Sequence, residues 1–263
     1  SSYQIGLLME ANFLGVPEVP LWLFIFLSIT TIATTMLGML TGTVGGLGLL
    51  AVMAIFFTPS ILVPLHTIIQ LGVGSSRAII MWRYVLKETL VPFTIGAVLG
   101  AALGAQIYIA LPTGVLQGII AVMIIVLIWM PSFTLLGTIK KRFGMLGFAA
   151  TNIGMFVSAT GTLVGPFVAG ASETRQNHAS TMAGLMAISH ICKLVAFGLL
   201  GISLSSYLPL IAAMIACGIL GNFAGRFFLN KMPEHWFRRT FKILMTALAL
   251  RLLYVAGAEI GIF

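Results

Sequence analysis

Long apolar runs, separated by short polar or glycine-bearing stretches, dominate the pattern of residues along this chain. The pattern delimits ten apolar segments: 20–41, 44–58, 61–82, 89–110, 113–131, 143–160, 161–172, 178–201, 206–229 and 235–257. Several segments approach the roughly 20 residues that a membrane-spanning helix needs, and none is dominated by the alternation typical of strands. The pattern therefore predicts an all-α integral membrane protein.

Composition supports this prediction and narrows the function. Hydrophobic residues make up 59% of the 263 residues and charged residues only 8%, whereas soluble domains carry about 25% charged residues. The net charge of +8 does not indicate a nucleic-acid partner, because helical membrane proteins concentrate Lys and Arg in cytoplasmic loops. Cys192 and Cys217 both fall in apolar runs and indicate neither a disulfide framework nor a metal site.

The two halves of the chain resemble each other. Thr41, Gly42, Thr43 and Gly46 recur 119 residues later as Thr160, Gly161, Thr162 and Gly165. Gly100, Gly104 and Pro112 recur 121 residues later as Gly221, Gly225 and Pro233. These two sets of matches predict an internal repeat. We expect an N-terminal interfacial segment rather than a signal peptide at 1–19, a first transmembrane repeat at 20–136, a basic cytoplasmic linker at 137–142 and a second repeat at 143–263.

The distribution of charge predicts the topology. If all ten segments cross, the loops on one side hold Arg83, Lys87, Lys140, Lys141, Arg142, Arg175 and Lys231. The opposite side then has no Lys or Arg, so the positive-inside rule places both termini outside the cytoplasm. Five crossings per half would make the two repeats inverted relative to each other.

Segments 44–58 and 161–172 are too short to cross alone as straight helices. Their 15 and 12 residues would span about 22 and 18 Å, whereas the hydrocarbon core is about 30 Å thick. We expect them to be short discontinuous helices whose glycine-rich starts are drawn inward, and whether they cross fully or are re-entrant stays open.

The glycine- and threonine-rich breaks before these segments are the first candidate binding site. Their residues are Thr41, Gly42, Thr43, Gly45 and Gly46 in the first half and Thr160, Gly161, Thr162 and Gly165 in the second. Irregular backbone is tolerated in a membrane where it lines a cavity, and N–H groups at a helix N-terminus attract anions. Close helix packing through small residues is the alternative.

Cationic residues within the apolar segments are the second candidate. Arg77 and Lys193 lie deep in their segments, and His190 precedes Lys193 by three residues, on the same helical face. Intramembrane charges are costly and mark functional sites, so a cation without a nearby carboxylate indicates an anionic ligand. Snorkelling of Arg77 to the surface and a hydrogen bond from His190 to a neighbouring helix are the alternatives.

Other polar residues on the apolar helices are interpreted as structural. His66 and His178 are expected to be mainly interfacial or structural, with His178 and the nearby Ser180 and Thr181 as candidate contributors to the site. Gln70, Ser75, Ser76, Asn152 and Asn222 are expected to join helices, and "GAVLGAALG" at 96–104 is expected to be a packing stripe. No sequence motif of an enzyme or of an ATP-binding loop occurs, and no cofactor is expected.

At these residues the sequence resembles the sulfite exporter TauE/SafE family. The resemblance is carried by "GTVGGLG", "GTLVGPF", "HICKLVAFG", and by "GAALGAQ" and "GNFAGRF" near the end of each half. The second break has Val164 and Pro166 where the family pattern is richer in consecutive glycines. The resemblance implies transport of sulfite, sulfonates or related sulfur oxyanions across the bacterial inner membrane, with both termini then in the periplasm.

The residues themselves predict a secondary transporter of a small anion, with its site between the two repeats. An anion channel on the same scaffold and a membrane subunit that only holds a partner are the alternatives. The expected partners are the anion and the lipid bilayer; a homodimer is left open.

Overall fold

The computed structural model describes residues 12–41, 44–129, 138–228 and 234–261, and its regular secondary structure in these residues is helical throughout. The first half contains α2 (Leu21–Thr41), α3 (Val44–Met53), α4 (Pro59–Ile80), α5 (Lys87–Ala110) and α6 (Thr113–Trp129). The second half contains α7 (Ile139–Val157), α8 (Gly161–Ala171), α9 (Arg175–Leu199), α10 (Leu208–Phe228) and α11 (Glu234–Glu259). Short 3₁₀ turns form η1 (Phe13–Gly15), η2 (Trp82–Tyr84) and η3 (Ser205–Tyr207). These helices confirm the all-α prediction for the described residues and follow the order of the predicted segments.

Two helix boundaries differ from the apolar pattern for local reasons. α3 ends at Met53, five residues before the end of the predicted segment, and α4 then starts at Pro59, a residue suited to the first position of a helix. α7 begins at Ile139 instead of 143, because the Thr138 side chain caps it by accepting a hydrogen bond from the Lys141 N–H at 3.4 Å. Apolar periodicity alone does not reveal such a polar first turn.

Four helical stretches in the described part of the chain are long and apolar enough to cross a membrane. They are Leu21–Gly38, Lys87–Ala110, Gln176–Leu199 and Ser205–Gly225. α3 and α8 have 10 and 11 residues, or about 15 and 17 Å of helix, so neither can cross the bilayer core alone. The expected number of ten crossing segments and their inverted arrangement stay predictions.

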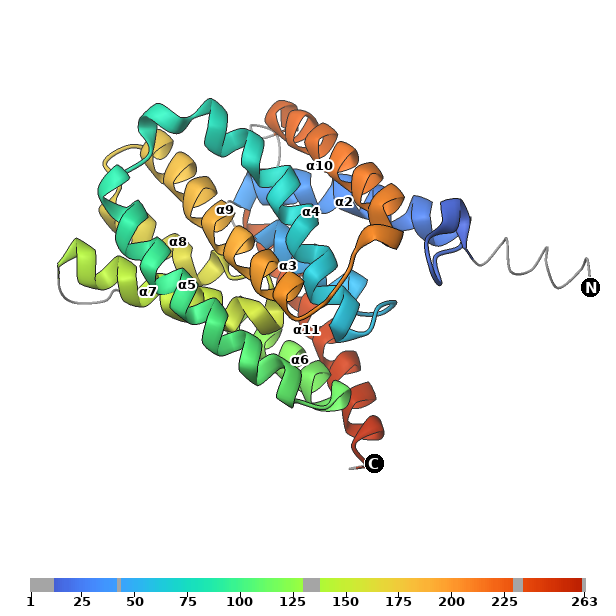
Figure 1. Ribbon diagram of the computed structural model, residues 1–263. Coiled ribbons are helices and arrows are strands. Elements are labelled where there is room, and N and C mark those ends of the chain that lie inside the picture. The colour runs from blue at the N-terminus through green and yellow to red at the C-terminus, as the bar shows by residue number, and fades with distance from the viewer. Residues whose placement is uncertain (1–11, 42–43, 130–137, 229–233, 262–263) are drawn as a thin grey trace, which may run out of the picture.

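Four helix pairs organise the bundle. α4 packs against α9 at the centre, α2 against α10 on one side, α5 against α7 on the other, and α6 against α11 (Figure 1). Each of these pairs joins a helix of one half of the chain to a helix of the other half. The core is therefore formed between the halves, and residues distant in sequence meet at the centre.

The predicted packing stripe is confirmed where α5 meets α7. A Cβ atom on Gly100 would fall on the carbonyl oxygen of Phe148, and one on Gly147 would fall on that of Phe93. Asn152 Nδ2 donates a hydrogen bond to the Gly100 carbonyl oxygen at 3.2 Å, which also confirms its expected role in joining helices. Small residues let these two backbones approach closely.

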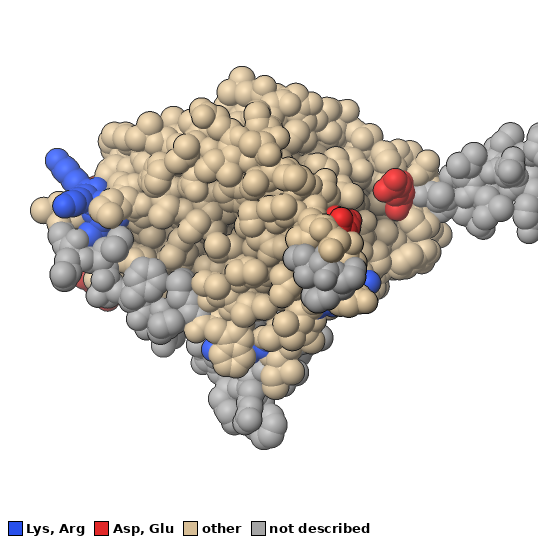
Figure 2. Space-filling view, turned by 90° about the horizontal axis from the view of Figure 1, so that it is seen from below, with Lys and Arg blue, Asp and Glu red and all other residues tan. Residues whose placement is uncertain are grey.

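The outer surface suits a lipid environment. Large apolar side chains are exposed along several helices, among them Trp22, Val91 and Val195 at 60%, 67% and 58%. Figure 2 shows a face on which uncharged residues cover most of the surface and charged residues form only a few small patches. This distribution is expected of helices that pass through a bilayer.

Candidate functional site

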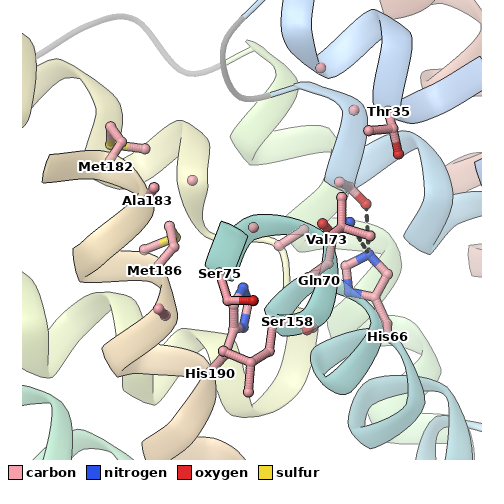
Figure 3. A pocket seen from close by; sticks show the side chains of 18 of the residues that line it. Thr35, His66, Gln70, Val73, Ser75, Ser158, Met182, Ala183, Met186 and His190 are labelled. Atoms are coloured by element: carbon pink, nitrogen blue, oxygen red, sulfur yellow. Dashed lines mark hydrogen bonds between the residues drawn. The ribbon is translucent and has the colours of Figure 1, made fainter. Parts of the chain in front are cut away.

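The two predicted breaks lie at one cavity. α2 ends at Thr41 and α3 follows at Val44, while α7 ends at Val157 and α8 follows at Gly161. A cavity of about 150 Å³ is lined by the first turn of α3 and by the residues that lead into α8 (Figure 3). A single water needs about 10–15 Å³ by the same measure, so the cavity has room for a small anion.

The cavity wall combines polar and apolar surfaces. From the first half come Thr34, Thr35, Gly38, Gly45, Gly46, His66, Gln70, Leu71, Val73, Gly74 and Ser75. From the second half come Ser158, Ala159, Thr160, Gly161, Met182, Ala183, Met186, Ala187, His190 and Asn222. In Figure 3 the two labelled methionines and Ala183 lie along one helix, opposite the group that contains Gln70 and His66.

Close backbone contact shapes the first break. A Cβ atom on Gly45 would fall on the carbonyl oxygen of Thr34 and would lie 2.8 Å from the Cα atom of Gly38. Glycine at both positions therefore lets the start of α3 lie against the end of α2. The ring nitrogen Nε2 of His66, on α4, lies 2.9 Å from the Gly46 carbonyl oxygen and ties α3 to α4.

Side-chain hydrogen bonds hold the second break. Ser158 has a φ of +62°, a left-handed conformation that costs a non-glycine residue about 1–3 kcal/mol. Its carbonyl oxygen accepts a hydrogen bond from Lys193 Nζ at 3.0 Å. Its hydroxyl lies 2.7 Å from that of Thr67, which donates to the Val63 carbonyl oxygen at 2.7 Å, so Ser158 is the donor between the two hydroxyls. Lys193 thus places its charge at the C-terminal end of α7, where a cation is favourable.

The start of α8 presents polar groups without partners. The Thr160 carbonyl oxygen accepts from the N–H groups of Leu163 and Val164 at 3.0 and 3.2 Å, which leaves the N–H groups of Gly161 and Thr162 outside the intrahelical pattern. The hydroxyls of Thr160 and Thr162 are buried and have no hydrogen-bond partner among the described residues. Buried polar groups are normally paired, so these donors suit a bound ligand.

The described site contains basic side chains and no acidic one. Lys193 is fully buried, and His66 and His190 are 0% and 6% exposed and lie close enough to Lys193 for electrostatic interaction. The chain contains no Asp, and its acidic residues are Glu10, Glu18, Glu88, Glu173, Glu234 and Glu259. None of the residues lining the cavity in the described structure is acidic. Together with two helix N-termini, these groups favour an anion.

The structure brings part of the predicted site together. Gly45, Gly46, Thr160, Gly161 and His190 line the cavity. Four others lie nearby or elsewhere on the same elements: Thr162 in the first turn of α8, Gly165 buried one turn later, Lys193 behind Ser158, and Arg77 on α4. Gly42 and Thr43 lie outside the described residues, as do the side chains of Thr41 and Arg77.

Sequence reasoning missed the inward position of His66. It was expected to be interfacial or structural, yet it lines the cavity with Gln70, one helical turn away on the same face of α4. That spacing is the signal that could have identified the pair. Ser75 and Asn222, expected only to join helices, also line the cavity, and His178 does not. Ser158 carried no signal, because its role comes from a backbone conformation.

Comparison with known proteins identifies one family. The family model described as sulfite exporter TauE/SafE matches residues 26–252, which include both breaks and every residue lining the cavity. No curated protein and no solved structure matches the chain significantly.

Proposed function

The chain belongs to the sulfite exporter TauE/SafE family, and we propose that it is a secondary transporter of a small sulfur-containing anion. Sulfite, a sulfonate or a related oxyanion would cross the bacterial inner membrane. The observation that carries this proposal is that helix starts from both halves line one cavity whose described wall has no acidic residue. Discontinuous helices with N-termini directed at an anion are a recurring feature of secondary transporters.

The proposed ligands are N–H and O–H donors. Backbone N–H groups at Gly45, Gly46 and Gly161 and the hydroxyls of Thr160 and Thr162 would bind the oxygens of the anion. Thr41, Gly42 and Thr43 would complete the first break, and Gly165 would keep α8 close to its neighbours. His190, Lys193 and Arg77 would supply donors and positive charge. In this arrangement Lys193 acts mainly through Ser158, whose carbonyl it holds.

Alternating access between two repeats is the proposed mechanism. If the two halves are equivalent, α2 corresponds to α7 and α5 corresponds to α10. The packing of α2 against α10 then corresponds to the packing of α7 against α5, and both pairs are present. The same equivalence maps α4 onto α9 and α6 onto α11, which pack against each other. The predicted equivalence of Gly100 and Gly221 fits this scheme, because a Cβ on Gly221 would lie 2.6 Å from the Ile32 carbonyl oxygen of α2. Rocking of one half against the other would open the cavity to each side in turn.

The test is anion flux after removal of the buried charge. Lys193→Ala should abolish uptake of radiolabelled sulfite and thiosulfate into proteoliposomes, because it removes a positive charge and leaves the Ser158 carbonyl unpaired. Lys193→Met, which retains the apolar length of the side chain, should fail equally while folding normally. Lys242→Ala is the control, because it removes a lysine that does not line the cavity. Lys242 lies on α11, with its Nζ 5.0 Å from the centre of the Trp129 ring on α6. Normal flux in folded Lys193→Met would overturn the assignment.

The alternatives are tested in the same vesicles. A carrier shows saturable uptake and counterflow, whereas an anion channel on this scaffold passes large currents without counterflow. A subunit that only holds a partner would have a tightly packed apolar interface between the halves, and the polar cavity counts against it.

A further inference from the structure

Transport against a gradient needs a coupling ion, and the cavity offers few groups that could hold one. Carboxylates usually bind the proton or sodium ion in transporters, but none of the residues that line the described cavity is acidic. His66 and His190 are the titratable side chains in its wall, with Lys193 behind the second break. Imidazole gains and loses a proton near neutral pH, so the contacts of the histidine nitrogens decide where a proton can bind.

The contacts of His66 indicate which nitrogen is free to take a proton. Nε2 lies 2.9 Å from the Gly46 carbonyl oxygen and 3.2 Å from Gln70 Nε2. A carbonyl can only accept, so the shorter contact requires a hydrogen on His66 Nε2. Two donors cannot bond to each other, so the Gln70 amide is assigned with its oxygen toward the same hydrogen. Amide nitrogen and oxygen are assigned from such contacts. Nδ1 is left with a lone pair, buried and without a partner among the described residues.

The groups around His66 make protonation of Nδ1 dependent on an anion. α2, α3 and α8 carry no titratable side chain, and the charged residues of α7, Lys140, Lys141 and Arg142, lie in its first turn. On α9, His190 and Lys193 are near enough to interact with His66, and Cys217 on α10 does not line the cavity. The side chains of Arg77 on α4 and Arg226 on α10 lie outside the described residues. A second cation beside Lys193 in this buried site is unfavourable unless an anion lies between them.

We propose that His66 is the proton-binding site of the transporter and that it takes up one proton with each anion. This inference rests on the proposed function. A proton from water binds the Nδ1 lone pair when the anion enters, and the Nε2–H bond to Gly46 stays in place. When the anion leaves on the other side of the membrane, the Nδ1–H bond breaks and the proton returns to water. No oxidant, reductant or other reactant is required.

The same hydrogen bond links the proton to the proposed anion site. Gly46 lies in the first turn of α3, and its carbonyl is bound by His66 while its neighbouring backbone lines the cavity (Figure 3). An anion at this turn is therefore close to the imidazolium that forms. The bound anion and the proton on His66 stabilise each other, so each binds more weakly when the other is absent. This reciprocity is what coupling between a substrate and an ion requires.

The first test measures proton uptake when the purified full chain binds an anion in weakly buffered detergent solution containing a pH-sensitive dye. Thiosulfate is the probe, because it does not itself take a proton near neutral pH. The wild type should take up about one proton for each thiosulfate bound. His66→Gln should bind thiosulfate without proton uptake, since its amide can still donate to the Gly46 carbonyl but cannot be protonated. His178→Gln, a histidine on α9 outside the cavity wall, should behave as the wild type.

The second test separates this inference from the proposed function. In proteoliposomes a pH gradient should drive thiosulfate uptake by the wild type, whereas folded His66→Gln should retain counterflow but lose the response to the gradient. Wild-type flux without proton movement would leave the transporter standing and overturn the role of His66. Proton uptake by His66→Gln would also overturn that role. Thiosulfate binding by the wild type without proton uptake would overturn it as well, and that measurement does not depend on the folding of a variant. A wild type that neither binds nor moves any anion would overturn the proposed function itself.

Discussion

The two breaks have the same form but are built from different chemistry. In each half a short helix starts at the cavity, and the long helix that follows it returns a basic side chain to a backbone carbonyl: His66 to Gly46 and Lys193 to Ser158. In the first break Gly45 lies directly against the backbone of α2, which is possible because glycine has no side chain. The second is shaped by hydrogen bonds to a strained Ser158. The first should therefore be sensitive to added atoms and the second to removed ones.

Adding one methyl group to the first break should have the largest effect. In Gly45→Ala the new Cβ would fall on the Thr34 carbonyl oxygen, which belongs to backbone and cannot rotate away. We expect anion flux to be lost and the free energy of unfolding to fall by about 3 kcal/mol. Thermal unfolding in detergent and flux in proteoliposomes measure the two effects.

A matched glycine gives the control for that prediction. Gly118 lies in α6, and a Cβ there would meet only the Cβ of Ala256 at 3.9 Å, an ordinary van der Waals contact. Gly118→Ala should therefore keep wild-type flux and stability. Comparable losses in both variants would show that α3 does not depend on close approach at Gly45.

Removing a hydroxyl from the second break should affect binding more than folding. Thr160→Val deletes a buried hydroxyl that has no partner among the described residues, so stability should not fall. If this hydroxyl binds the anion, the apparent KM for thiosulfate should rise about tenfold, equivalent to about 1.4 kcal/mol. Thr94→Val, on α5 away from the cavity wall, should leave the KM unchanged. An unchanged KM in Thr160→Val would remove this hydroxyl from the site.

The smallest expected effect is a difference in stability between two variants of Ser158, which separates the contribution of backbone strain from that of the hydrogen bond. Ser158→Ala loses the bond to Thr67 and should lower the free energy of unfolding by about 1 kcal/mol. Ser158→Gly loses the same bond but tolerates the φ of +62°, so it should be about 1 kcal/mol more stable than the alanine variant. Thermal unfolding of the two purified variants gives the comparison. Equal stabilities would mean that the backbone conformation is not strained.

Much of the fold followed from the sequence because its signals are local. Apolar runs located the ten helices of the described residues in the right order, and glycine-rich stretches located the breaks before α3 and α8. The errors lie at helix ends, where Thr138 capping and Pro59 decide the boundary instead of hydrophobicity. The family resemblance was also correct, since it rests on short motifs that the sequence displays directly.

The candidate site was predicted less completely. Gly45, Gly46, Thr160, Gly161 and His190 were recognised from the sequence and line the cavity. His66 was interpreted as interfacial or structural, because a helix that is apolar on nearly all sides does not show which face it turns inward. Lys193 was expected to face the ligand, but its ammonium group lies behind Ser158. Both positions depend on how α4 and α9 pack.

The sequence by itself determined that this protein is a bundle of apolar helices, broken at two glycine- and threonine-rich points, and that it belongs to its family. These properties depend on composition and on neighbours along the chain. Only the tertiary structure decided that the two breaks meet at one cavity, that His66 holds the first and Lys193 the second, and that no described carboxylate joins them. Those relations depend on contacts between residues far apart in sequence, such as Thr67 and Ser158, which are separated by 91 positions. Such contacts form only when the two halves pack together.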